Sequence, residues 1–158
     1  MPLDNVNFQT PVWCCEYMVS LIPEGCKKIL EPTPGQGNIV NVLKDKGYEV
    51  ISPHDFFSTN IFDWQIEKFD CIVMNPPFTP MKLGYEILYK CMEMSDNIIA
   101  LMPWLSLING EKRTKDIIEF GLKSVTHLPR KTFAGSRVQC CIMEMNKGYD
   151  GEVKLKFI

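Results

Sequence analysis

The sequence lacks the cysteine pattern and the long apolar run that would point to a metal, a disulfide framework or a membrane. Its seven cysteines are an odd number and include no C-x-x-C pair, which supports neither a disulfide framework nor a zinc site. No run of about 18 apolar residues is present, and no basic segment followed by an apolar one stands at the N-terminus. We therefore expect a soluble, cytoplasmic protein without a metal or a membrane partner.

An excess of charge of one sign is also lacking. The net charge of −2 at pH 7 argues against indiscriminate binding to nucleic acid. The segment 111–137 differs, because its basic residues outnumber its acidic ones. The basic residues are Lys112, Arg113, Lys115, Lys123, Arg130, Lys131 and Arg137, and the acidic ones are Glu111, Asp116 and Glu119. This segment is either a solvated face or a local patch that contacts phosphates.

Short apolar strands and amphipathic helices alternate along the 158 residues, which suffice for one domain with a real core. Thr10 is expected to cap the first helix, with Pro11 at its first position. The predicted helices cover 11–22, 38–46, 83–94 and 112–122, and the predicted strands 27–30, 48–52, 69–74, 97–102, 124–128 and 138–145. The pattern predicts an α/β fold: a Rossmann-like, doubly wound, mostly parallel sheet with an antiparallel strand near the C-terminus.

The stretch around which the chain is organised is 71–78. Its four apolar residues, 71–74, predict a buried strand of a parallel sheet, and Asn75-Pro76-Pro77-Phe78 follows directly. The two prolines cannot donate to a ladder, so they end the strand in a stiff loop at the edge where open α/β sheets bind ligands. An amide, two carbonyls and an aromatic ring suit a flat ring that bears an amine. Alternatively, the loop does no more than terminate the strand.

A glycine-rich loop, residues 31–37, follows the predicted strand 27–30. Gly35 and Gly37 allow a tight turn and a close approach of the backbone to a ligand. The spacing is not G-x-G-x-x-G and no Lys-Ser or Lys-Thr follows, so neither a dinucleotide fingerprint nor a phosphate loop fits. Glu31 would repel a pyrophosphate, and it suits a cationic or amine-bearing ligand instead.

These loops resemble those of S-adenosylmethionine-dependent amino-methyltransferases, the adenine-N6 DNA methyltransferases whose catalytic loop reads NPPF or NPPY. Residues 31–37 resemble the cofactor loop and Asn75-Pro76-Pro77-Phe78 the catalytic loop, while Phe8-Gln9-Thr10-Pro11 resembles the N-terminal Thr-Pro segment of the family. The order of the segments is similar to that of the subgroup with the target-recognition region last. The resemblance covers essentially the whole chain and implies the class I methyltransferase fold.

The resemblance implies S-adenosylmethionine as the cofactor, with Glu31 near its amino group. Asp55 would hold the ribose, as its place after the strand 48–52 also favours, but it could instead cap a turn. Because this segment is short, His54 and Asp63 remain candidates for the same role. The other cofactor residues implied are Thr10, Pro11, Pro32, Gly35 and Gly37, with Phe56 against the adenine and Asn60 accepting from its amino group.

The resemblance implies Asn75, Pro76, Pro77 and Phe78 as catalytic residues, with Phe78 stacking on the target base. Phe133 would face that base from the other side, or it is a core residue. Arg130 and Lys131, next to it, would contact the substrate.

DNA is the expected partner, and methyl transfer to adenine N6, as in restriction–modification, the expected reaction. RNA or a protein glutamine amide could take the methyl group instead, or the chain could be a non-catalytic binding module. We expect residues 1–158 to form one domain without a separate target-recognition domain.

Overall fold

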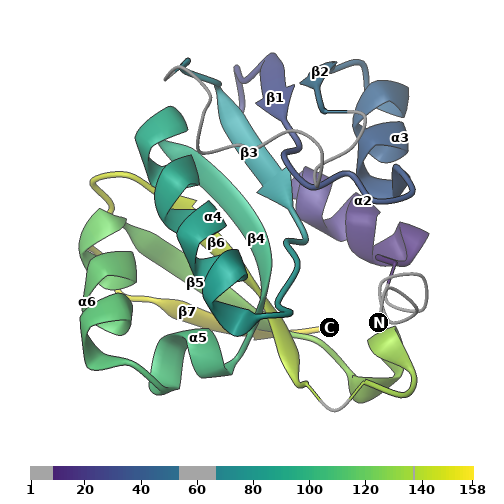
Figure 1. The fold of residues 1–158 in the computed structure, drawn as a ribbon. Coiled ribbons are helices and arrows are strands. Elements are labelled where there is room, and N and C mark those ends of the chain that lie inside the picture. The colour runs from purple at the N-terminus through teal and green to yellow at the C-terminus, as the bar shows by residue number, and fades with distance from the viewer. Residues whose placement is uncertain (1–8, 54–66, 137) are drawn as a thin grey trace.

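The computed structural model describes residues 9–53, 67–136 and 138–158. Its centre is a seven-stranded sheet with the order β2-β1-β3-β4-β6-β5-β7 (Figure 1). The strands are β1 (Lys28–Leu30), β2 (Glu49–Ile51), β3 (Cys71–Met74), β4 (Asn97–Pro103), β5 (Leu122–His127), β6 (Cys140–Asn146) and β7 (Lys154–Phe157). Strand β6 runs antiparallel to β4 and β5, and the other paired strands are parallel. The expected mixed, mostly parallel sheet is confirmed.

Helices pack on both faces of this sheet. They are α2 (Val12–Ser20), α3 (Asn38–Asp45), α4 (Met81–Met94), α5 (Leu105–Ile108), α6 (Glu111–Phe120) and the short 3-10 helix η2 (Arg130–Phe133). Figure 1 shows α4, α5 and α6 on one face and α2 and α3 on the other. This is the doubly wound arrangement that the alternating pattern predicts.

Strand β3 joins the two apolar cores that these helices cover. Ile72 and Met74 belong to the core beneath α4 and α6, whereas Cys71 and Val73 belong to the core beneath α2 and α3. All four side chains are fully buried. Because both faces of the strand are covered, the sequence here is a continuous apolar run rather than an alternating one.

Several predicted elements need correction. The first helix begins at Val12, and Pro11 rather than Thr10 takes the N-cap position, without a side-chain cap. Helix α5, η2 and strand β7 were not predicted. Each has only four residues, too few for a clear local period, and β7 depends on its pairing with β5. The antiparallel strand is therefore β6, and the chain's last strand runs parallel to its neighbour.

Candidate active site

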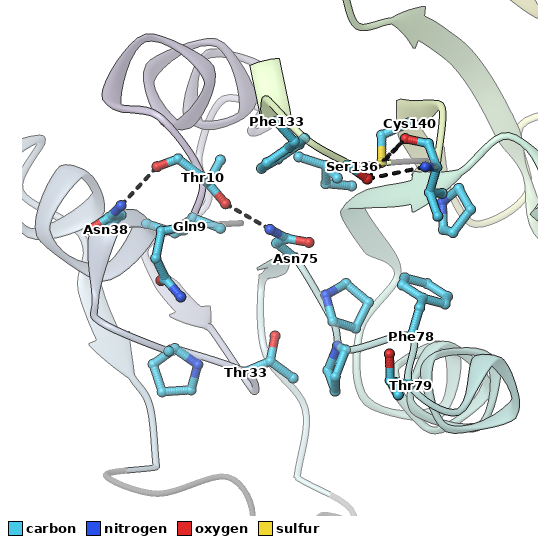
Figure 2. Close-up of a pocket in the computed structure, with 18 of the residues that line it drawn as sticks. Gln9, Thr10, Thr33, Asn38, Asn75, Phe78, Thr79, Phe133, Ser136 and Cys140 are labelled. Carbon is cyan, nitrogen blue, oxygen red and sulfur yellow. Dashed lines mark hydrogen bonds between the residues drawn. The ribbon is translucent and has the colours of Figure 1, made fainter. Parts of the chain in front are cut away.

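A cavity of about 470 Å³ opens where β1, β3 and β4 end (Figure 2). Its walls come from the segment before α2, the loop after β1 with the start of α3, the loop after β3 with the start of α4, the end of β4, and the stretch from the end of η2 to the start of β6. Open parallel sheets place their ligands at this edge, and cavities of this size hold cofactor-sized molecules.

Asn75 lies at the centre of the cavity, directly after the buried strand β3. Its amide nitrogen donates a hydrogen bond of 3.0 Å to the hydroxyl of Thr10. Figure 2 shows the amide oxygen pointing away from Thr10, toward the side of the cavity that carries Phe78. The geometry therefore offers an acceptor to the interior and keeps the donor end of the amide occupied.

Phe78 forms part of the opposite wall and is held by helix α4. Its ring packs edge-on to Tyr85, with the ring centroids 5.8 Å apart. A Cβ atom added to Gly84 would overlap the Phe78 ring, so the ring occupies the space that a side chain at position 84 would need. The guanidinium carbon of Arg113 lies over the ring of Tyr85, 3.8 Å from its centroid. Helix α4 thus fixes where Phe78 can lie.

Glu31 is a buried acid at the tip of β1, with 1% of its surface exposed. One of its oxygens accepts hydrogen bonds from the backbone N–H and the hydroxyl of Thr33, at 2.7 and 3.1 Å. No ion pair joins it to a residue that the structure describes. Burial raises its pKa to about 8, which the bonds from Thr33 only partly oppose. An acid in this setting is stabilised by a cationic ligand.

The glycines of the loop after β1 have backbone conformations that favour glycine. Gly35 has φ +53° and Gly37 has φ +89°, both in the left-handed region. Gly35 lines the cavity, whereas Gly37 stands at the N-terminus of α3 outside the lining. The turn between them is closed by a 2.7 Å bond from the Gly37 N–H to the Pro34 carbonyl.

The segment between η2 and β6 supplies the remaining wall. Phe133 lines the cavity and is 7% exposed, and it also belongs to the core beneath α2 and α3. Ser136 and Cys140 line the same wall (Figure 2). Burial raises the pKa of the Cys140 thiol to about 11, so this thiol is protonated near neutral pH. Both readings of Phe133, as a cavity residue and as a core residue, thus describe its position.

The structure brings many of the predicted site residues together and leaves others apart. Those that line the cavity are Thr10, Glu31, Gly35, Asn75, Pro76, Pro77, Phe78 and Phe133. Those that do not line it are Pro11, Pro32, Gly37, Arg130 and Lys131, the last two being exposed on η2. The predicted residues Asp55, Phe56 and Asn60, with the candidates His54 and Asp63, lie outside the described residues.

Sequence reasoning missed several residues of the lining. They are Gln9, Thr33, Pro34, Asn38, Ile39, Thr79, Met81, Leu101, Pro103, Gly135, Ser136, Val138 and Cys140. Thr33 and Asn38 could have been suspected, since Thr33 lies within the glycine-rich loop 31–37 and Asn38 follows it directly. Cys140 carries no local signal, because the pairing of β6 with β4 sets it opposite Pro103 at the cavity.

The cavity is nearly free of charge. Among its described lining residues, Glu31 is the only Asp, Glu, Lys, Arg or His. No cluster of three or more His, Cys, Asp or Glu that could hold a metal ion occurs in the described part of the chain. A neutral cavity with one buried acid fits a ligand that carries a cationic group together with flat, weakly charged parts.

Comparison with known proteins identifies the fold. No protein-family profile and no curated protein sequence matches the chain. The methyltransferase subunit of a type I restriction-modification system from Streptococcus thermophilus matches with a TM-score of 0.71 and 14% identity, over 96% of this chain and 47% of that one. The chain has the class I methyltransferase fold. It spans about half the length of that subunit.

Two further structures support this fold. A protein from Listeria monocytogenes assigned to the class I S-adenosylmethionine-dependent methyltransferases matches with a TM-score of 0.67 and 17% identity, over 97% of this chain and 67% of that one. A dimethyladenosine transferase from Plasmodium falciparum matches with a TM-score of 0.57 and 14% identity, over 87% and 62%. None of the helices in the described ranges is long and apolar enough to cross a membrane.

Proposed function

We propose that this chain is an S-adenosylmethionine-dependent methyltransferase that acts on the exocyclic N6 amine of adenine in DNA. One observation carries the proposal: a single cavity joins Glu31, a buried acid that forms no ion pair with a described residue, to the loop Asn75-Pro76-Pro77-Phe78 at the edge of the sheet. The first suits the cationic part of a cofactor. The second suits a planar amine.

The residues on the β1 side fit the cofactor. Glu31 forms no ion pair with a cationic side chain among the described residues. The ammonium group of a methionine moiety would supply this positive charge. Gly35 lines the cavity with a positive φ, and a Cβ atom added there would lie 3.0 Å from the side-chain oxygen of Gln9, another lining residue. We also assign Pro11, Pro32, Gly37, Asp55, Phe56 and Asn60 to this half of the site, on the strength of the sequence resemblance. When bound, S-adenosylmethionine supplies an electrophilic methyl group on a positively charged sulfur.

The residues on the β3 side fit the target amine. An exocyclic amine is a weak nucleophile because its lone pair is delocalised into the ring. The Asn75 amide oxygen and the Pro76 carbonyl would accept its two hydrogens, which favours a tetrahedral nitrogen and aims the lone pair. Two prolines keep this loop stiff, so little freedom is lost when the amine is held. Orientation of this kind can lower a barrier by several kcal/mol, up to roughly 7–11.

The aromatic residues fit a base that has left its stack. Phe78 would stack on the base, an interaction worth about 1–3 kcal/mol, and Phe133 would bound it on the other side. A base in a duplex must first be flipped out, at a cost of a few kcal/mol. Arg130 and Lys131 lie on η2, which ends at Phe133, and both are exposed. They would contact the phosphates beside the flipped base.

RNA is a second candidate substrate, favoured by the structural similarity to a protein from Pyrococcus horikoshii described as an RNA methyltransferase, beside the dimethyladenosine transferase. The cavity itself gives no preference, because its described lining would meet the base and not the sugar that distinguishes the two nucleic acids. A methyltransferase subunit of a type I restriction-modification system gives the higher TM-score, 0.71 against 0.57. We therefore give DNA precedence.

The proposal is tested by transfer of a labelled methyl group. The native protein and Asn75→Ala are incubated with labelled S-adenosylmethionine and with duplex DNA, single-stranded DNA, RNA or cell protein. We expect label in DNA from the native protein and labelling at least about 100-fold slower from the variant, with N6-methyladenine as the product in digested DNA. Label in RNA or protein alone would reject DNA as the substrate. Equal labelling by the variant, or no labelling at all, would reject the proposal.

A further inference from the structure

The hydroxyl of Thr10 connects the segment before α2 to the catalytic loop. Its oxygen lies 3.0 Å from the amide nitrogen of Asn75, although the two residues are 65 positions apart. Thr10 is 4% exposed and Asn75 is half-buried, so the contact lies partly buried at the cavity wall. Thr10 precedes the N-cap position of α2, which Pro11 occupies, and no side chain caps this helix. The hydroxyl of Thr10 is therefore available to the distant amide of Asn75.

The contact determines what Asn75 presents to the cavity. A side-chain amide has a donor end and an acceptor end of similar size, and rotation about its last bond exchanges them. Thr10 occupies the donor end and holds the plane of the amide, so that the acceptor end faces the interior (Figure 2). Without this bond the amide could turn its N–H groups toward the target amine, which is also a donor. Donor would then oppose donor.

Thr10 is itself fixed by the loop after β1. Its backbone carbonyl accepts a 2.9 Å hydrogen bond from the side-chain amide of Asn38, the first residue of α3. The thiol of Cys15 donates to the same carbonyl at 3.5 Å. Asn38 follows Gly37 directly. One residue thus ties the glycine loop, through its backbone, to the catalytic loop, through its hydroxyl.

We propose that Thr10 is a positioning residue for methyl transfer that acts through Asn75 rather than through the cofactor. This inference rests on the proposed function. It replaces the cofactor-binding role that the sequence resemblance implies for Thr10. Because a hydroxyl can donate as well as accept, Thr10 would also hold a carboxylate at position 75 by reversing the direction of the bond.

The test compares hydroxyl-bearing and hydroxyl-free variants of Thr10. Thr10→Val keeps the shape and removes the hydroxyl, and Thr10→Ser keeps the hydroxyl. Single-turnover methylation should fall about tenfold in Thr10→Val, the loss of one partly buried neutral hydrogen bond, and change less than about twofold in Thr10→Ser. Cofactor affinity, measured by calorimetry, should stay within about threefold in both. If valine prevents folding, Thr10→Ala serves as the hydroxyl-free variant.

Two readouts separate this role from a merely structural one. In the Asn75→Ala background, Thr10→Val should lower the rate no further, because the group through which it acts is gone. In nitrogen-proton NMR spectra, the side-chain amide signals of Asn75 should move in Thr10→Val and remain in place in Thr10→Ser. Thr114→Val is the matched control, since its hydroxyl binds the Leu107 carbonyl on the α5–α6 side. It should alter neither the rate nor these signals.

The outcomes distinguish this inference from the proposed function. If native protein methylates and Asn75→Ala does not, a native rate in Thr10→Val overturns the inference alone. A tenfold or greater loss of cofactor affinity with unmoved Asn75 signals assigns Thr10 to the cofactor and also overturns it. If native protein labels no substrate, the proposed function fails, and the NMR comparison still decides whether Thr10 holds the Asn75 amide.

Discussion

After β1 the chain turns through two glycines with positive φ, whereas after β3 it runs through two prolines, and both loops line the same cavity. The first loop contributes its backbone and a single acid, Glu31, to the cavity wall. Glu31 is buried and accepts hydrogen bonds from Thr33 within the same loop. The second presents side chains that are held from outside. Thr10 binds the amide of Asn75, and Gly84 makes room for the ring of Phe78.

The difference suggests a division of work between the loops. Where a loop contributes its backbone and one charged side chain, substitution of that side chain should affect mainly ligand affinity. A loop whose side chains are fixed by distant elements can lose turnover while ligand affinity survives. Variants in the loop after β1 should therefore change mainly cofactor binding, and variants in the loop after β3 should change mainly methyl transfer.

The largest effect is expected at Asn75. Asn75→Ala removes the acceptor that orients the target amine, and we expect single-turnover methylation to fall at least about 100-fold, or roughly 2.7 kcal/mol of barrier. Cofactor affinity by calorimetry should change less than about threefold, because the β1 side is untouched. Asn75→Asp should keep part of the activity, since a carboxylate still accepts from an amine. If Asn75→Ala lost cofactor affinity together with turnover, the separate roles of the two loops in binding and in transfer would be contradicted.

The second largest effect is expected for Phe78→Ala, which should weaken the binding of the target base. The expected loss is about 1–3 kcal/mol of stacking, seen as weaker binding of an adenine-containing oligonucleotide. The loss should be larger in duplex than in single strands, because only the duplex must meet the cost of flipping. Fluorescence titration of both oligonucleotides measures it, with cofactor affinity as the control. An equal effect on both would show that Phe78 does not contact a flipped base.

The pH dependence of stability should identify the acid on the β1 side. Glu31 has a pKa raised to about 8 in the folded chain against an ordinary 4.5, so between these values the folded state holds a proton that the unfolded state has lost. The free energy of unfolding should therefore fall as pH rises across this window. The fall should approach about 1.4 kcal/mol per pH unit for this group.

Urea denaturation of cofactor-free native protein and of Glu31→Gln, from pH 5.5 to pH 7.5, measures this slope. The difference between the two proteins isolates the contribution of Glu31, because every other titrating group is shared. A cofactor whose ammonium binds the carboxylate should lower the pKa of Glu31, release a proton on binding below pH 8, and reduce the slope. Parallel profiles for the two proteins would contradict the raised pKa.

The smallest effect is expected at Gly84. In a helix interior, Gly→Ala ordinarily stabilises by about 0.5–1 kcal/mol. Here the added methyl would overlap the Phe78 ring, and we expect a net destabilisation of about 1 kcal/mol, as in other overpacked sites. In the Phe78→Ala background the same change should stabilise the chain instead. Thermal unfolding is measured for the native protein, Gly84→Ala, Phe78→Ala and the double variant. Equal effects of Gly84→Ala in both backgrounds would show that the added methyl group does not contact the Phe78 ring.

The positions of both loops could be predicted from the sequence because glycine and proline act locally. Gly35 and Gly37 allow a turn wherever they stand, and Pro76 and Pro77 end a strand whatever surrounds them. The run Cys71–Met74 likewise predicted a buried strand, since burial on both faces leaves a continuous apolar pattern. Strand β7 was missed because its four residues gain their order only from pairing with β5.

The sequence by itself determined the alternating α/β order, the two loops at the carboxyl ends of β1 and β3, and the presence of an acid in the first. Only the tertiary structure decided which side chains meet there. Thr10 has the local signature of a helix cap, yet its hydroxyl binds Asn75, because folding brings this half-buried amide to a distance of 3.0 Å from it. Cys140 reaches the cavity through the long-range pairing of β6 with β4. Local patterns specify backbone conformation, but contacts between distant residues depend on how the whole sheet assembles.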